Sequence, residues 1–309
     1  MRKSRILVIG STNIDMVVQL PTLPAPGETV LGGVFRMTPG GKGANQAVAA
    51  ARAGGAVTFL TALGDDNFAV ESRQHFTEEG IETRFIVDKT GVASGVALIM
   101  VDAHGENLIA VASGANMQLQ QEELSAAEAA FDDAQMAILQ LEIPLESVAW
   151  AVERATLIGC RVLLNPAPIP PTGLPDAILS QVDILTPNEG ELQALAPEAR
   201  AVEEAAAQLL ARGPQMVVVT QGRRGATAFT REGALHLPAF TVKTVDTVGA
   251  GDCFSACLGV ALAEGQALPE ALRFAIAAAG LSTTVPGAQA SMPTRGAIED
   301  FLTTKSTKG

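Results

Sequence analysis

The order of apolar and polar positions along the chain predicts strands that alternate with helices. Apolar runs of strand length lie at residues 5–9, 57–63, 136–141, 161–164, 182–185 and 216–220. Stretches of helical character lie between most of them, at residues 66–79, 121–130, 145–157, 189–195 and 200–212. Because this alternation is typical of parallel βαβ units, we expect a single α/β domain over residues 1–309, with a mostly parallel sheet and helices on both faces.

A second group of strand-like segments does not follow this alternation. Residues 28–37 follow a Pro-rich stretch and have the pattern of a half-buried strand, and residues 92–101 and 107–112 flank a turn. We expect these segments to build a small sheet, a lid, inserted into the main domain from about residues 12–38 and 92–113. Since a small flap with one apolar face needs a partner to cover it, we expect the chain to form a homodimer through its lid sheets.

Polar residues follow the predicted strands, where ligands of parallel sheets bind. They are Asn13, Asp15, Gln140, Glu142, Asn165, Asn188, Thr220 and Gly222. Asn and Asp directly after a buried strand often cap turns. Their donors and acceptors also suit the hydroxyl groups of a polyol, so both interpretations stay open for Asn13 and Asp15.

The segment at residues 245–257 is a Gly-rich turn that opens a helix. Gly249 and Gly251 have no side chain to block a ligand, and the apolar run that follows has no Pro. The first N–H groups of a helix lack internal partners and favour an anion such as a phosphoryl group. Asp252, in the first turn, either stabilises the helix terminus or acts as a general base beside this anion site.

Three other loops carry candidate binding residues. Gly41 and Gly43 flank Lys42, with Asn45 close behind, at the start of an Ala-rich helix; the loop either supplies turns or brings donors to substrate oxygens. Asn188 and Glu191 fit a capping box, but a carboxylate there also suits hydrated Mg²⁺ on nucleotide phosphates. The loop at residues 220–225 holds two arginines that either reach phosphates or are solvated in a hairpin turn.

Composition and charge exclude several classes of protein. A net charge of −12 argues against a nucleic-acid-binding protein. The first apolar run is too short for a signal peptide or a membrane span, and three cysteines in a long chain fit a reducing compartment, so we expect a cytoplasmic protein without a membrane partner. Phe254 stands where a dinucleotide-binding G-x-G-x-x-G would need glycine, and Gly43 follows Lys42 where a P-loop needs Ser or Thr.

Taken together, these motifs resemble the pfkB, or ribokinase-like, family of sugar kinases. The resemblance runs from about residue 6 to residue 301. Its segments are GSTNID at 10–15, GGKGANQAVAA at 40–50, SGAN at 113–116, LQLE at 139–142, NPAP at 165–168, TPNE at 186–189 and DTVGAGD at 246–252. The family resemblance implies a three-layer α/β/α sandwich with a small β-sheet lid.

The resemblance also implies a role for each matching residue. Asp252 would take the proton from the primary hydroxyl of the sugar, and the N–H groups of Gly249, Ala250 and Gly251 would form the anion hole. Sugar contacts would come from Asn13, Asp15, Gly41, Lys42, Asn45 and Glu142. ATP contacts would come from Asn188, Thr220, Gly222, Gly225 and Gly251, with Glu191 in the Mg²⁺ and phosphate region. A monovalent cation, usually K⁺, would be held by oxygens of Asp246, Val248, Ser282, Val285, Gly287 and Ser291.

Two features depart from the family pattern. Ile276 stands where Asn or His often lies near the adenine, which removes a polar contact to the nucleotide. Val285 and Pro286 replace basic residues ahead of the cation loop; if position 285 contributes only its carbonyl oxygen, the cation site is retained.

The leading hypothesis is ATP-dependent phosphorylation of D-ribose at O5. The alternatives are a kinase for 2-deoxyribose or fructose, a sugar-responsive protein without catalysis, and a nicotinamide-dependent oxidoreductase, against which Phe254 argues.

Overall fold

A central sheet of eight strands forms the core of the computed structural model, which describes residues 3–306. In spatial order its strands are β14 (Gly233–Leu237), β13 (Ala226–Thr230), β12 (Met216–Thr220), β11 (Ile184–Leu185), β10 (Arg161–Leu164), β9 (Met136–Leu139), β1 (Arg5–Ile9) and β4 (Ala56–Leu60). The strands from β12 to β4 pair in parallel, and β13 and β14 add an antiparallel edge. The predicted α/β class with a mostly parallel sheet is therefore confirmed.

Both faces of this sheet are buried because apolar side chains point alternately to either side. In β1, Ile6 and Val8 belong to one hydrophobic cluster, whereas Leu7 and Ile9 belong to the other. The first cluster contains residues of α1 (Lys42–Arg52), α2 (Asn67–Glu78), α8 (Ala250–Ala263), α9 (Leu268–Ser282) and α10 (Arg295–Ser306). The second contains residues of α3 (Gln121–Ala126), α4 (Leu145–Leu157), α5 (Asp176–Leu179), α6 (Glu189–Leu195) and α7 (Val202–Ala211). The result is the three-layer α/β/α sandwich.

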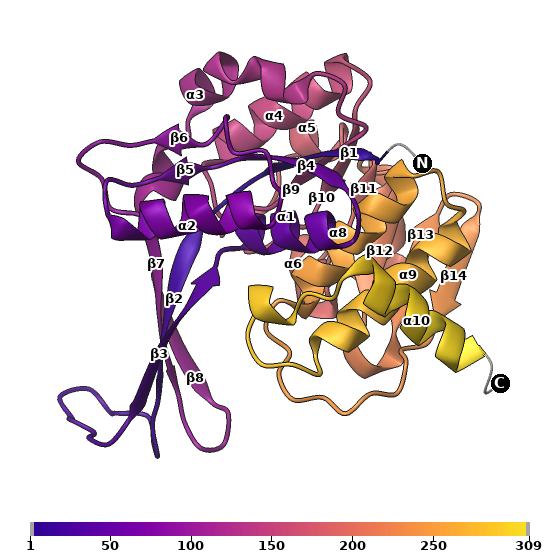
Figure 1. Cartoon of the computed structure of the whole chain (residues 1–309). Coiled ribbons are helices and arrows are strands. Elements are labelled where there is room, and N and C mark those ends of the chain that lie inside the picture. The colour runs from indigo at the N-terminus through magenta and orange to yellow at the C-terminus, as the bar shows by residue number, and fades with distance from the viewer. Residues whose placement is uncertain (1–2, 307–309) are drawn as a thin grey trace.

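A separate sheet of four strands projects from this body (Figure 1). Its order is β3 (Val34–Gly40), β2 (Asn13–Gln19), β7 (Gly95–Val101) and β8 (Asn107–Ala112). The register places Phe35 and Met37 on the same face as Leu98 and Leu108, and these four side chains are exposed. Asp15 lies on the opposite face, at the end of β2 that joins the body.

Several predicted boundaries were wrong. Residues 28–33 are not a strand, because two glycines interrupt the extended chain, Gly32 with a positive φ of 90°, and Leu31 is exposed; the strand begins at Val34 and runs to Gly40. Asn13 and Asp15 lie within β2 and do not cap a turn. The run at residues 57–63 divides into β4 and a short strand, β5 (Ala62–Leu63), which pairs with β6 (Val87–Asp88).

Short 3₁₀ helices complete the secondary structure. They are η1 (Gly114–Gln118), η2 (Glu128–Phe131), η3 (Gly222–Arg224) and η4 (Gln289–Ser291). The expected helix at residues 121–130 is thus split into α3 and η2. Within residues 3–306, no helix has both the length and the hydropathy that a membrane crossing requires.

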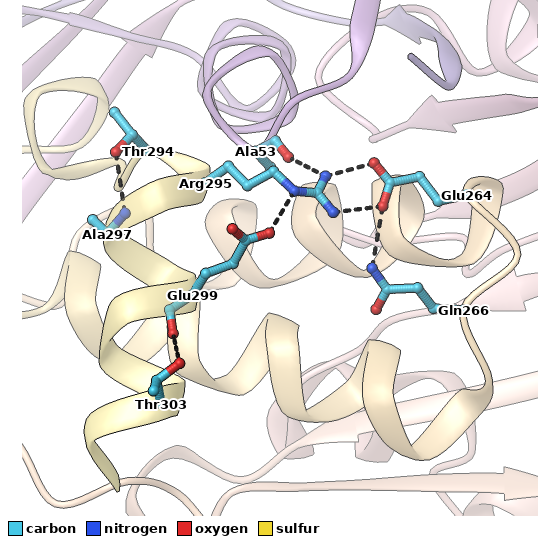
Figure 2. Close-up of polar contacts among 8 residues, drawn as sticks. All are labelled: Ala53, Glu264, Gln266, Thr294, Arg295, Ala297, Glu299 and Thr303. Atoms are coloured by element: carbon cyan, nitrogen blue, oxygen red, sulfur yellow. Dashed lines mark hydrogen bonds and ion pairs between the residues drawn. The ribbon is translucent and has the colours of Figure 1, made fainter. Parts of the chain in front are cut away.

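Arg295 joins the last helix to the ends of two others (Figure 2). Its guanidinium donates to both carboxylate oxygens of Glu264, at 2.5 and 2.7 Å, and to the carbonyl of Ala53 at 2.9 Å. Glu264 ends α8 and Ala53 ends α1, so a single side chain connects α10 to both. Glu299 accepts a further hydrogen bond from Arg295 one turn along α10.

We expect Arg295→Met to lower the free energy of unfolding by about 1–3 kcal/mol, because the charged hydrogen bonds are lost and Glu264, whose side chain is 22% exposed, is left without its cation. Glu299→Gln is the matched control. Glu299 is 59% exposed and its pair with Arg295 spans one helical turn, so its loss should cost only about 0.3–0.5 kcal/mol. Urea unfolding measures the free energy of unfolding of both variants. An equal loss in the two would contradict the role of Arg295 in connecting the three helix ends.

Candidate active site

The first part of the site forms where the end of β1 meets the start of α1. The Ser11 hydroxyl donates to Oε2 of Glu142 at 2.5 Å, and the backbone N–H of Lys42 donates to the same oxygen at 3.0 Å. Gly43 is required here because a Cβ would lie 2.5 Å from the backbone of Gly10 and of Ser11. These contacts hold Glu142 and Lys42, residues 100 positions apart, beside each other.

Asn13 and Asp15 reach the same place from β2. Asn116 donates through Nδ2 to Oδ1 of Asn13 at 2.8 Å and fixes that side chain. The backbone at Gly40 and Gly41 packs so closely that a Cβ at Gly40 would lie 2.3 Å from Oδ1 of Asp15, and one at Gly41 would lie 2.7 Å from the Asn13 nitrogen. Gly41 also has a positive φ of 87°, which favours glycine.

Asp252 lies at the centre of the site and is buried. Asn45 donates through Nδ2 to Oδ2 of Asp252 at 2.9 Å, and Gln46 donates through Nε2 to Oδ1 at 2.9 Å. Burial raises the pKa of Asp252, opposed by the charge of Lys42 and by these two hydrogen bonds. The Oδ1 atom of Asn45 is buried and has no hydrogen-bond partner among the described residues.

The carboxylates of Asp252, Glu142 and Glu191 all act on the pKa of Lys42, and Asp15 lies near the first two. Desolvation, with the charges of Glu142 and Asp252, raises the pKa of Asp15 to about 6. Burial acts to lower the pKa of Lys42, but the carboxylates of Asp252, Glu142 and Glu191 outweigh it and raise that pKa. Lys42 therefore stays charged and compensates the negative charge of the cluster.

The helix that carries Asp252 begins with free donors. Gly249 is the N-cap of α8 in the left-handed conformation, with φ of 76°. The N–H of Ala250 donates to the carbonyl of Thr247 at 3.2 Å, whereas those of Gly249 and Gly251 have no partner among residues 3–306. Two of the three expected anion-hole donors are thus available to a ligand, and that of Ala250 would first have to leave Thr247.

A pocket of about 460 Å³ opens beside this helix start. Six predicted residues line it, and they are Thr220, Gly222, Gly225, Ala250, Gly251 and Ile276. Ile276 is almost fully buried and forms part of an apolar wall with Phe240 and Ala279. A planar, apolar ring system fits such a wall, and the Gly251 end offers the backbone donors.

Asn188 and Glu191 do not line this pocket. They form a capping box at the start of α6, in which each backbone N–H donates to the side chain of the other residue at 2.8 Å. Glu191 nevertheless lies near the carboxylates of Asp252 and Glu142, because its charge acts on Lys42 together with theirs. Arg223 lines the pocket with an exposed side chain, while Arg224 forms an ion pair with Glu189.

The residues predicted for a cation lie in two segments that meet, the loop before α8 and the segment from the last residue of α9 through η4. Asp246 accepts from the N–H of Val248 at 3.0 Å and from that of Gly287 at 2.9 Å, which ties the loop before α8 to the loop after α9. The side chains of Val248 and Val285 are exposed, so only their carbonyls can serve as ligands. Ser282 and Ser291 are buried and donate to backbone carbonyls.

Sequence reasoning missed Gln46, which touches Asp252 directly. It lies within the motif GGKGANQAVAA and looked like part of a helix of high propensity. A long polar side chain among alanines, next to Asn45, was the available signal. Gln140 and Asn165, noted only as strand-end residues, both contact Gln46.

Comparison with known proteins identifies the family of this chain. Residues 3–295 match the family model described as pfkB family carbohydrate kinase. The chain belongs to the pfkB family of carbohydrate kinases.

Among its relatives, the ribokinase of Haemophilus influenzae is 39% identical over 306 residues, which cover 98% of this chain and 99% of that protein. The ribokinase of Bacillus subtilis is 40% identical over 297 residues, covering 96% and 99%. The deoxyribokinase of Salmonella typhimurium is 36% identical over 301 residues, covering 96% and 98%.

Solved structures of ribokinases share the fold. The Thermotoga maritima enzyme superimposes with a TM-score of 0.90 at 36% identity, covering 97% of this chain and 99% of that one. A structure of Arabidopsis thaliana ribokinase complexed with ribose and ATP gives a TM-score of 0.90 at 30% identity with the same coverage.

Proposed function

We propose that this enzyme transfers the γ-phosphoryl group of ATP to the primary hydroxyl, O5, of D-ribose and produces ribose 5-phosphate. One observation carries the proposal: the Asp252 carboxylate lies in the first turn of α8, held by Asn45 and close to Asp15, Glu142 and Lys42, next to the pocket that Gly251 lines. Ribokinases are prominent among the relatives, and one solved neighbour contains ribose and ATP.

The sugar would bind among the polar side chains at the end of β2 and the start of α1. Asn13, Asp15, Gly41, Lys42, Asn45 and Glu142 supply acceptors and donors there. The unpartnered, buried Oδ1 of Asn45 suits a donating hydroxyl, because a buried acceptor without a partner is costly. A polyol satisfies more of these groups than an apolar ligand of the same size.

Asp252 would act as the general base. It removes the proton of the O5 hydroxyl while O5 attacks the γ-phosphorus and the bond to the β–γ bridging oxygen breaks, releasing ADP. The N–H groups of Gly249 and Gly251, and that of Ala250 once released, would stabilise the charge on the transferring group. ATP would lie in the pocket lined by Thr220, Gly222, Gly225 and Ile276.

Two metal ions fit the residues present. Glu191 keeps one carboxylate oxygen outside its capping bond and suits hydrated Mg²⁺ on the phosphates near Asn188, since Mg²⁺ prefers few carboxylates. K⁺ suits the carbonyl-rich junction of the loops that Asp246 connects, with Val248, Ser282, Val285, Gly287 and Ser291 around it. These ions would neutralise phosphate charge and order the anion-hole loop.

A coupled ADP-release assay tests the proposal. D-ribose, 2-deoxyribose and fructose are offered at equal concentration, each with and without K⁺, and D-ribose is expected to give the highest kcat/KM, raised by K⁺. Turnover with none of the sugars would overturn the proposal. The deoxyribokinase relative makes 2-deoxyribose the second candidate, and a higher kcat/KM with that sugar would favour it.

The pH dependence of sugar binding follows from Asp15. Its carboxyl is neutral below the raised pKa of about 6 and ionised above it. Only the ionised form accepts hydrogen bonds through both oxygens, so the Kd for ribose should rise as the pH falls through this value. Calorimetry without ATP, from mildly acidic to neutral pH, measures this. The Asp15→Asn variant should bind ribose more weakly, and its Kd should not depend on pH in this range. If the Kd of both proteins changed with pH to the same extent, Asp15 would not be the group responsible.

We also propose that the small sheet serves as a lid and joins two copies of the chain. One of its faces carries Phe35, Met37, Leu98 and Leu108, all exposed, and an apolar face of this kind on a projecting sheet requires cover. Light scattering should give a dimer, and Leu98→Lys should give a monomer. A monomeric wild-type protein at micromolar concentration would overturn the proposal.

We propose a cytoplasmic location because of the state of the cysteines. Cys160, Cys253 and Cys257 are all buried and unpaired, as thiols of a reducing compartment are.

A further inference from the structure

A chain of buried side-chain amides lies behind Asp252. Gln46 donates through Nε2 to Oδ1 of Asp252 at 2.9 Å and to Oδ1 of Asn165 at 3.2 Å. Gln140 donates through Nε2 to Oε1 of Gln46 at 2.5 Å. Asn165 in turn donates through Nδ2 to the carbonyl of Thr186 at 3.0 Å. Gln46 and Gln140 are fully buried, so solvent cannot replace these bonds.

This series of hydrogen-bonded side chains leads back to α8, the helix that carries Asp252. The hydroxyl of Thr186 lies 2.9 Å from that of Ser255, which is on α8 one turn after Asp252. The ends of β9, β10 and β11 and the first turn of α1 thus connect into one polar circuit with α8. All of these elements belong to the central body, and none belongs to the small sheet.

The orientation of the Gln46 amide is fixed by its neighbours. Both hydrogens of its Nε2 are used, one on Asp252 and one on Asn165, and its oxygen accepts from Gln140. A flipped amide would place its oxygen against the carboxylate and against Oδ1 of Asn165, and its nitrogen against a donor. Buried polar groups without partners are costly, so a single orientation is strongly favoured.

We propose that Gln46 is a positioning residue, which the amides of Gln140 and Asn165 fix and which holds the Asp252 carboxylate ionised and aimed at the sugar hydroxyl. This inference rests on the proposed function, in which Asp252 is the base. Asn45 binds the other carboxylate oxygen but also belongs to the proposed sugar site, so its contact can change when the sugar binds. Gln46 is behind the carboxylate and can keep its contact throughout the reaction.

Gln46 also affects the charge state of the base. Burial raises the pKa of Asp252, and the hydrogen bond from Gln46 opposes this rise. Four charged groups surround the same carboxylate: Lys42 lowers the pKa of Asp252 and Glu142 raises it, and the charge of Asp252 in turn raises the pKa values of Asp15 and Glu191. Removal of the Gln46 donor leaves these four groups and the hydrogen bond from Asn45 in place, and removes one of the two hydrogen bonds that oppose the rise.

The test compares Gln46→Met with the wild type and with Asp252→Asn, using ribose and ATP. Methionine has similar length but cannot donate, so we expect kcat to fall about 10²-fold through misalignment, with both KM values nearly unchanged. The acid limb of the kcat/KM profile should move to higher pH, because the base becomes harder to ionise. Gln215→Met is the matched control: it removes a glutamine bond to a carboxylate, Asp183, far from the site, and should leave kcat and the profile unchanged.

A second variant removes only the amide of Gln140, which contacts Gln46 but not Asp252. Gln140→Leu leaves the contact between Gln46 and Asp252 intact and frees the Gln46 oxygen, so kcat should fall less, with the same direction of pH shift. The double variant should be no slower than Gln46→Met, since the two act through one contact. If Gln46→Met does not fold, Gln140→Leu still decides the question through its pH profile.

The possible failures are distinguishable. Wild-type turnover in Asp252→Asn would overturn the proposed function and this inference with it. An inactive Asp252→Asn beside a Gln46→Met of unchanged kcat would overturn the positioning role alone. A lower kcat with an unmoved acid limb, or a change confined to KM, would also overturn it.

Discussion

Asp252→Asn is expected to lower kcat by about 10²–10⁴-fold, because the variant keeps the shape of the side chain but cannot accept the proton of the sugar hydroxyl. An amide at this position also meets two donors, from Asn45 and Gln46, and can satisfy only one of them with its oxygen. Steady-state turnover with ribose and ATP measures the effect.

Folding and sugar binding must be separated from chemistry in that experiment. Thermal unfolding should show a folded protein, and calorimetry should show ribose binding close to that of the wild type. A variant that binds ribose and turns over at the wild-type rate would remove Asp252 from the reaction.

Gly249→Ala is expected to lower kcat by about 10²–10³-fold, the range for loss of one anion-hole donor. Gly249 has φ of 76°, where a side chain is strained, and a Cβ would lie 3.1 Å from the Cε atom of Met292 and 3.2 Å from Ala288. The loop must move to accommodate it, which displaces the N–H groups of Gly249 and Gly251 from the phosphate site.

The other end of the same helix provides the control. Gly265 has φ of 81° and follows α8, but a Cβ there meets nothing within 4 Å. Gly265→Ala carries a similar backbone strain and should cost about 1–2 kcal/mol of stability without changing kcat. Equal loss of turnover in both variants would mean that strain in α8, and not the anion hole, controls the rate.

The fold was predictable because the strands have a strong local signal. Runs such as those at Met136–Leu139 and Met216–Thr220 are continuous and apolar, as strands buried on both faces must be. The order of the strands was not predicted, because no local sequence pattern indicates that β1 lies between β9 and β4. The start of β3 was misplaced because residues 28–33 have a strand-like composition but no pairing partner.

The site was predictable where a residue type is itself unusual. Glycines around Lys42, and an Asp after Gly249 and Gly251, stand out from an ordinary helix start. Gln46 differs from the alanines around it, but nothing in the sequence connects it to Asp252, which is 206 residues away and which only the packing of α1 on α8 brings next to it. The same holds for Arg295, whose partner Glu264 is 31 residues away. Its role depends on the ends of α1 and α8 lying next to the start of α10, which the sequence does not show.

The central claim is that the phosphoryl group of ATP arrives on O5 of ribose. Phosphorus NMR of the product, formed from ATP and D-ribose, tests this most directly. We expect a single phosphate ester coupled to the two hydrogens on C5, formed in equal amount with ADP. A phosphate on another oxygen, or ADP formed with free inorganic phosphate and unchanged sugar, would contradict it.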